Sequence, residues 1–186
     1  MSFQSDVAQI LRDPPVNRIG FKVEHIAIDR TQMDLVAQTI EKQDISVAVG
    51  NSGPQLGAAY SSFVGRRFGP GEKKLIGSIT LGSENVVRSA LGRAAIFHES
   101  VHALKDVKGW KVPTMQDEEV VAYLADAMYL RANHTSVTGG ALEMAIYNAA
   151  FAIVDARKML MSLGVILRWT DCDALRAAIK AHPAYR

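Results

Sequence analysis

Residues 94–104 of the chain read AAIFHESVHAL. Apolar residues flank His98, Glu99 and His102 on both sides, and this pattern is typical of a helix that is largely buried. Histidines four positions apart lie one turn apart on the same face of a helix. The stretch therefore predicts a helix that holds two imidazoles and a carboxylate close together in a protected place.

The residues on either side of this stretch differ in character, and the change comes near residue 82. The part before it is rich in β-branched residues, glycine and turn signals, whereas the part after it is rich in Ala, Leu and Met at helical spacing. Before residue 82 we predict strands at 21–28, 45–49, 58–64 and 74–81, helices at 5–12 and 31–43, and a turn at 50–54. After it we predict helices at 83–107, 114–133, 142–163 and 170–181.

Residue types at the predicted helix ends support these ranges. The start signals are Thr31, Ser83 and the capping-box spacings at 114–117 and 170–173, and the stop signals are Gly109 and Gly164. We expect an α+β fold in a single domain, residues 1–186. A small, mostly antiparallel sheet in a strand-rich lobe (about 1–82) would precede a helical bundle in a second lobe (about 83–186).

The composition narrows the classes of function. The chain has 186 residues, of which 48% are hydrophobic and 22% charged, and this excludes a disordered or collagen-like protein. The net charge is only +2, so we expect no nucleic-acid partner. Cys172 is the only cysteine, which excludes an internal disulfide and a cysteine-built zinc site.

The most apolar run, residues 145–154, is shorter than the about 20 residues that span a membrane, and the N-terminal residues have no signal-peptide pattern. We therefore expect no membrane partner and a cytoplasmic location, with export by a non-classical route and the oligomeric state left open.

The spacing of His98, Glu99 and His102 suits zinc chemistry. Two imidazole nitrogens one turn apart can occupy two corners of a zinc tetrahedron. Glu99 would project beside the metal, where a carboxylate can take a proton from water and give it to a leaving amine. The pattern therefore predicts a hydrolytic Zn²⁺ site, and the alternative is a chance pair of core or surface histidines.

A catalytic zinc site needs a third protein ligand, and the next predicted helix offers Glu118 and Glu119. His102 lies about one and a half turns before the end of its helix, and Glu119 lies about one turn into the next. Both would then sit at similar heights on antiparallel neighbours. Glu118 points about 100° away from Glu119. We therefore prefer Glu119 as the third ligand and keep Glu118 as the alternative.

With these residues, the chain resembles the gluzincin metallopeptidases over about residues 74–133. In that family H-E-x-x-H lies on one helix, and a glutamate on the next helix is the third ligand. The resemblance implies a zinc-dependent peptidase that acts on a peptide or protein. Its ligands would be His98, His102 and Glu119, and Glu99 would be the general base and acid. The resemblance also implies that the strand at 74–81 pairs with an extended substrate.

Two features depart from the larger gluzincins. The spacing from His102 to Glu119 is shorter, and Tyr123 stands where those members have an aspartate that supports a histidine. Asp126, one turn further on, could take this role, and the alternative for Asp126 is an ordinary helix charge. His134 is a possible alternative ligand. The candidates to stabilise an oxyanion are Tyr60, Tyr123, Tyr129, His134 and Tyr147.

Two other functions remain open beside a general peptidase. One is a toxin-like or regulatory metalloprotease with a single protein target, and the other is a non-catalytic, metal-containing module that binds peptides. Basic pairs at 66–67 and 73–74 form a local patch that could steer an acidic partner, although a solvated loop explains them as well.

Overall fold

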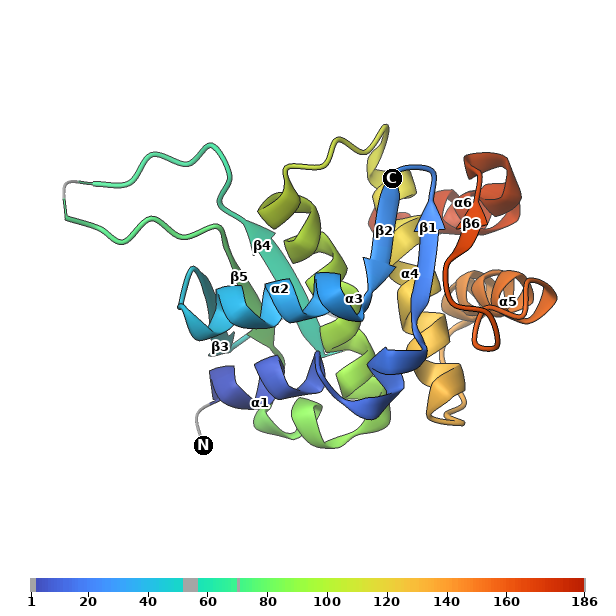
Figure 1. Ribbon diagram of the computed structural model, residues 1–186, viewed down its shortest axis with the longest axis horizontal. Helices are drawn as coiled ribbons and strands as arrows, with labels where there is room; N and C mark the ends of the chain where they lie inside the picture. The colour runs from blue at the N-terminus through green and yellow to red at the C-terminus, as the bar shows by residue number, and fades with distance from the viewer. Residues whose placement is uncertain (1–2, 52–56, 70, 186) are drawn as a thin grey trace.

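The computed structural model of the protein describes residues 3–51, 57–69 and 71–185. Helices and strands alternate in the first part of the chain, and helices dominate the second part (Figure 1). The helices are α1 (Phe3–Ile10), α2 (Arg30–Glu41), α3 (Ala90–Lys108), α4 (Met115–Ala132), α5 (Ala141–Ala156) and α6 (Asp173–Ala181). The strands are β1 (Gly20–Val23), β2 (Ile26–Asp29), β3 (Ile45–Val49), β4 (Ala58–Ser62), β5 (Gly77–Leu81) and β6 (Val165–Leu167). The mixed α and β content is as predicted, and the turn predicted at 50–54 lies partly outside the described residues.

The described strands form two three-stranded sheets. In the first sheet, β1 lies between β2, which is antiparallel to it, and β6, which is parallel. In the second sheet, β5 lies between β3, which is parallel to it, and β4, which is antiparallel. The prediction of one mostly antiparallel N-terminal sheet is therefore wrong. Strand β6 escapes sequence analysis because three residues are too few to give a periodic signal.

The position of β5 corrects a further expectation. This strand corresponds to the predicted strand at 74–81, but it has a neighbour on each side and so no free edge for a peptide. The open edge on this side of the second sheet belongs to β4, which packs beside α3 (Figure 1).

Several element ends differ from the prediction. The predicted strand at 21–28 is a hairpin, because Glu24 has a φ of 52° and turns the chain between β1 and β2. Helix α2 is capped by Asp29 rather than Thr31, since the Asp29 carboxylate accepts a hydrogen bond of 3.0 Å from the N–H of Gln32. Helix α5 ends at Ala156 rather than near residue 163, and turns lead from it to β6.

Helix α3 starts later than Ser83. A short 3₁₀ helix covers Glu84–Arg88, and Ser89 then caps α3 by accepting a hydrogen bond of 2.9 Å from the N–H of Gly92. Gly92 is tightly enclosed, because a Cβ at this position would lie 2.1 Å from the carbonyl oxygen of Val86. At the other end, Gly109 ends α3 in the left-handed conformation, as predicted.

Helix α4 begins where the capping-box spacing places it. The Thr114 hydroxyl accepts a hydrogen bond of 3.1 Å from the N–H of Asp117. The corresponding prediction at 170–173 is wrong, because Trp169–Cys172 forms a 3₁₀ turn whose Asp171 carboxylate accepts from the N–H of Arg168. Helix α6 follows and ends at Ala181, as predicted.

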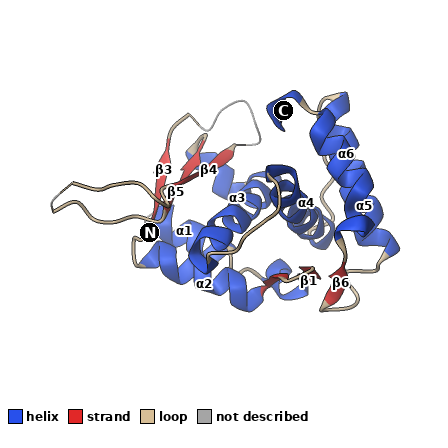
Figure 2. Ribbon diagram, turned by 90° about the horizontal axis from the view of Figure 1, so that it is seen from above, coloured by secondary structure: helices blue, strands red, loops and turns tan. Residues whose placement is uncertain are grey.

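Helices α3 and α4 lie side by side in the middle of the molecule (Figure 2). The second sheet lies on one side of this pair, and α5 and α6 lie on the other. Along α4, every residue from Glu119 to Leu130 is buried. One continuous hydrophobic cluster includes residues from both predicted lobes, among them Ile79 of β5 and Leu124 of α4. This packing fixes the faces of α3 and α4 against each other.

The connection between β4 and β5 projects from this body (Figure 1). It carries the two basic pairs, which are exposed. The guanidinium of Arg66 lies 5.3 Å from the centre of the Phe63 ring, and Lys73 pairs with Asp44 at 3.4 Å. Within the described residues, no helix is long and apolar enough to cross a membrane.

Candidate metal centre

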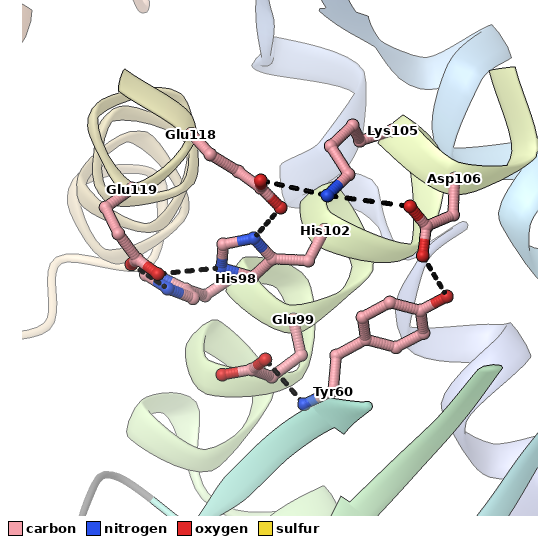
Figure 3. Close-up of polar contacts among 8 residues, drawn as sticks. All are labelled: Tyr60, His98, Glu99, His102, Lys105, Asp106, Glu118 and Glu119. Carbon is pink, nitrogen blue, oxygen red and sulfur yellow. Dashed lines mark hydrogen bonds and ion pairs between the residues drawn. The ribbon is translucent and has the colours of Figure 1, made fainter. Parts of the chain in front are cut away.

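The facing surfaces of α3 and α4 bring the predicted ligands together. His98 and His102 come from α3, and Glu119 comes from the first turn and a half of α4 (Figure 3). One ligand atom from each of these side chains lies within 4.8 Å of the others. His98 and Glu119 are buried, with 6% and 9% of their surface exposed. The cluster is thus enclosed by protein on most sides.

Two distances within this cluster are close to the separation of ligand atoms in a tetrahedral metal site. His98 Nε2 lies 3.2 Å from Glu119 Oε2, and His102 Nε2 lies 3.5 Å from Glu119 Oε1. Zn–N and Zn–O bonds of about 2.0–2.1 Å at a tetrahedral angle separate two ligand atoms by about 3.3 Å. Two imidazoles and one carboxylate are also the donor set that zinc commonly takes in hydrolytic sites. The residues present therefore fit a zinc ion.

Glu118 occupies a different place from Glu119. Its Oε1 lies 2.7 Å from Nδ1 of His102, and its Oε2 accepts a hydrogen bond of 2.9 Å from Lys105 Nζ. A carboxylate on Nδ1 keeps the proton there and leaves Nε2 free for a metal. Glu118 is therefore arranged to orient His102, whereas Glu119 lies against both Nε2 atoms.

Asp126 lies behind His98 on the side away from Glu119. It is fully buried, and its Oδ2 is 4.0 Å from His98 Nδ1. The Tyr147 hydroxyl donates a hydrogen bond of 2.6 Å to the same oxygen. Among the residues that the structure describes, neither His98 Nδ1 nor Asp126 Oδ1 has a hydrogen-bond partner, although both atoms are buried. A shift of less than an ångström would join Nδ1 to the carboxylate, so Asp126 stands where a residue supporting His98 would stand.

The charges of the cluster shift the pKa values of its members. Burial lowers the pKa of His98, but the hydrogen bond to Glu119 and the charges of Glu119, Glu99 and Asp126 together outweigh burial and raise this pKa to about 9. Burial also lowers the pKa of His102, but the hydrogen bond to Glu118 and the charges of Glu119 and Glu99 together outweigh burial and raise this pKa. The pKa of Glu119 is lowered, since burial is outweighed by its hydrogen bond to His98 and by the two histidines' charges. A metal bound here would displace protons from the imidazoles.

Glu99 follows His98 on α3 and points to the neighbouring sheet. Its Oε2 accepts a hydrogen bond of 2.7 Å from the backbone N–H of Tyr60 in β4 (Figure 3). The side chain is partly exposed and lines the same cavity as the histidines. A carboxylate thus stands next to the ligand cluster without being part of it.

The cavity at this site has a volume of about 250 Å³. Its walls are the five His and Glu side chains of α3 and α4, with Tyr60, Ser62, Lys105 and Tyr185. A larger cavity of about 430 Å³ lies beside β1 and the turn at 163–164. The smaller cavity is the one that contains the cluster of metal-ligating groups, and we therefore take it as the candidate site.

Three side chains that line the cavity are not predicted from the sequence, namely Ser62, Lys105 and Tyr185. Tyr185 is the one of these that contacts Tyr123. It comes from a 3₁₀ turn, Pro183–Tyr185, and its hydroxyl lies 2.8 Å from the hydroxyl of Tyr123. The Gln116 side chain donates a hydrogen bond of 2.9 Å to its backbone oxygen. No local signal marks this residue, because only the packing of the chain end on α4 brings it to the cavity.

Of the tyrosines predicted as oxyanion stabilisers, Tyr60 lines the cavity, whereas Tyr123, Tyr129 and Tyr147 do not. Tyr123 is buried behind the cavity with its ring edge-on to His98 at 4.7 Å between ring centres. The hydroxyl of Tyr60 donates to Asp106 at 3.0 Å, Tyr129 packs on Phe97, and Tyr147 bonds Asp126.

His134 is exposed beyond the far end of α4. The rise of a helix puts it about 20 Å from Glu119. His134 is therefore excluded both as a ligand and as an oxyanion stabiliser.

Comparison with known proteins adds no relative: no family model, no curated protein and no solved structure matches this chain.

Proposed function

We propose that this protein is a zinc-dependent peptidase with a gluzincin-type, zincin-like site. The observation that carries the proposal is the largely buried cluster of His98, His102 and Glu119, which opens to a cavity that Glu99 also lines. Zinc bound by these three residues would supply a Lewis acid that polarises a carbonyl and makes water more acidic. The donor set of two imidazoles and a carboxylate supports zinc as the metal, and the distances of 3.2 and 3.5 Å support a single shared ion.

Glu99 is the proposed general base and acid. It would take a proton from the attacking water and deliver this proton to the nitrogen of the leaving amine. Its position next to His98, partly exposed in the cavity, supports this role. Glu118 and Asp126 would hold the rings of His102 and His98 through Nδ1.

The Tyr185 hydroxyl is the proposed hydrogen-bond donor to the oxyanion that forms on the substrate carbonyl. Tyr185 lines the cavity together with the ligand cluster, and we prefer it to Tyr60, which also lines the cavity, because the Tyr60 hydroxyl donates to Asp106. Its contact with the Tyr123 hydroxyl at 2.8 Å orients the phenol group. Tyr123 would then act by positioning Tyr185.

The substrate is proposed to be an extended peptide that pairs with β4. This strand is at the edge of its sheet, and its Tyr60 and Ser62 line the cavity. An edge strand offers unpaired N–H and C=O groups to a peptide, which gives binding with little dependence on sequence.

A single experiment tests the proposed function. Wild-type protein loaded with Zn²⁺ is incubated with a mixed decapeptide library, and new termini are detected by mass spectrometry. Glu99→Gln should keep one zinc per chain and lose cleavage, whereas Glu84→Gln, at an exposed position outside the cavity, should cleave as the wild type does. Undiminished cleavage by pure Glu99→Gln protein would refute the role of Glu99. Bound zinc without cleavage of any library peptide would instead favour a single-target protease or a non-catalytic module.

A further inference from the structure

The open edge of β4 and the side chain of Glu99 meet at one backbone group. Hydrogen bonds of 2.6 Å from Gly82 N to Gly57 O and of 2.8 Å from Phe63 N to Ile76 O fix which residues of β4 face β5. The direction of the backbone N–H and C=O groups alternates along a strand. These groups therefore point to β5 at residues 57, 59, 61 and 63, and they point away from β5 at Ala58, Tyr60 and Ser62. The N–H of Tyr60 is thus one of the groups that a peptide would use to pair with β4.

In the structure this N–H is already used by Glu99. The bond to Glu99 Oε2 is 2.7 Å long, and it joins a backbone donor to a carboxylate. Hydrogen bonds to an ionised acceptor are roughly twice as strong as bonds between neutral groups. One N–H in good geometry serves one acceptor, so Glu99 and a paired peptide compete for it.

We propose that the hydrogen bond from the Tyr60 N–H holds Glu99 in the substrate-free protein and that an extended peptide breaks this bond when it binds. We call this hydrogen bond the latch. A peptide carbonyl that pairs with β4 takes the N–H, and Glu99 Oε2 is released toward the cavity where the reaction would occur. This inference rests on the proposed peptidase function. It makes Tyr60 a positioning residue that acts through its backbone, and it assigns the substrate class as peptides long enough to pair with β4.

The surroundings of Tyr60 indicate which partner moves. Its hydroxyl is bound to Asp106 at 3.0 Å, and its ring lies so close over Gly77 that a Cβ there would be 2.2 Å from the hydroxyl oxygen. Asp106 is 3.5 Å from Lys105, which is bound to Glu118 (Figure 3). Tyr60 is therefore held by β5 through its ring and by α3 through its hydroxyl. The carboxylate of Glu99, by contrast, has the hydrogen bond to Tyr60 as its one bond within the described residues. Release of the bond frees the glutamate and leaves the strand in place.

The latch predicts a dependence on substrate length. A hydrogen bond to a charged group shifts an equilibrium by about 10- to 100-fold, so most Glu99 side chains stay latched until a peptide pairs with β4. Blocked dipeptide amides are too short to pair along β4. When they bind, Glu99 is still hydrogen-bonded to the Tyr60 N–H, so we expect them to react slowly. Decapeptides open the latch as they bind and react faster.

The first test compares a variant that lacks the N–H of residue 60 with a variant that keeps this N–H. Proline at residue 60 lacks the N–H, and edge strands tolerate proline where the N–H points outward. The matched control is Tyr60→Ala, which loses the same ring but retains the N–H. With zinc-loaded proteins, Tyr60→Pro should cleave blocked dipeptide amides about 10-fold faster than Tyr60→Ala, because the base is no longer latched. It should also lose most of the preference for decapeptides. Equal dipeptide rates in two folded variants would overturn the proposal.

The second test uses metal-free protein and measures no activity. Hydrogen exchange of the Tyr60 amide, followed by NMR, should be about 10-fold or more faster in Glu99→Ala than in the wild type. The amide of Ala59, which faces β5, should exchange alike in both proteins. Equal exchange at Tyr60 would overturn the latch even if Tyr60→Pro failed to fold. Protection of the Tyr60 amide by Glu99, with no peptide cleaved by any zinc-loaded variant, would refute a general peptidase function and, with it, the release of Glu99 by such peptides.

Discussion

Glu118 and Glu119 are neighbours on α4, and the same chemical change at each should affect zinc binding by different amounts. Glu119→Gln replaces a carboxylate that lies 3.2 and 3.5 Å from two imidazole nitrogens by a neutral amide, which is a poor ligand for zinc. Structural zinc sites with four ligands bind with about 10–16 kcal/mol, so one ligand contributes roughly 2.5–4 kcal/mol. We therefore expect zinc affinity to fall by roughly 10²- to 10³-fold.

Glu118→Gln should have a smaller effect. Glu118 touches the Nδ1 side of His102 at 2.7 Å and Lys105 at 2.9 Å, so the change loosens a ligand without removing one. Loss of such a supporting group typically costs about 10- to 100-fold in metal affinity. We therefore expect Glu118→Gln to lose less zinc affinity than Glu119→Gln does.

The assay is a zinc competition against a chromophoric chelator, made on protein that has been stripped of metal. Thermal unfolding gives a second reading, because zinc at 100 times its dissociation constant stabilises the fold by about 2.7 kcal/mol. His134→Ala is the control for histidine loss and should bind zinc as the wild type does, since His134 is exposed at the far end of α4. A larger loss in Glu118→Gln than in Glu119→Gln would refute our assignment of the third ligand.

Three further predictions concern other parts of the molecule. Tyr185→Phe should leave zinc content unchanged and lower kcat by about 10²-fold, measured on the peptide library, because it removes the proposed donor to the oxyanion; an unchanged kcat would rule this role out. Gly92→Ala should lower the free energy of unfolding by about 1–3 kcal/mol in urea, because its methyl group would meet the Val86 carbonyl at 2.1 Å, and a stability equal to wild type would contradict this packing. Burial raises the pKa of the Cys172 thiol to about 11 from 9.0, so iodoacetamide at pH 8 should label it slowly in the folded protein and rapidly in urea. The unfolded chain loses this proton first as the pH rises, so the stability that Cys172 contributes should decline above about pH 9, and Cys172→Ala should remove that decline.

Part of the candidate site could be predicted from the sequence because it depends on helix geometry alone. The spacing of His98 and His102 puts both rings on one face, and the stop at Gly109 and the cap at Thr114 set the lengths of α3 and α4 near the turn between them. Counting turns from these ends then placed Glu119 level with His102, and the two side chains do face each other. The start of α3 was less accurate, because Ser83 and Ser89 are both good caps and only the chain around Val86 distinguishes them.

The sheets were harder to predict, since strand pairing joins residues far apart in the chain. The residues of β4 and β5 were expected as strands, but nothing local says which of them is the edge. The pairing of β6 with β1 brings together residues 165–167 and 21–23, and no periodicity records that contact. The resemblance implies that the strand at 74–81 pairs with a substrate, but this strand is β5, which lies between β3 and β4, and the strand that contacts Glu99 is β4.

By itself, the sequence determined the helix that carries His98, Glu99 and His102, the ends at Gly109 and Thr114, and the mixed α and β content. These features follow from hydrogen bonds and steric limits within a few residues, which local residue types control. Only the tertiary structure decided that Tyr185 lines the cavity, that Glu118 turns to His102, and that β4 presents its edge to Glu99. Those features depend on how buried surfaces pack across long stretches of chain, and that packing is a property of the whole core rather than of any short segment.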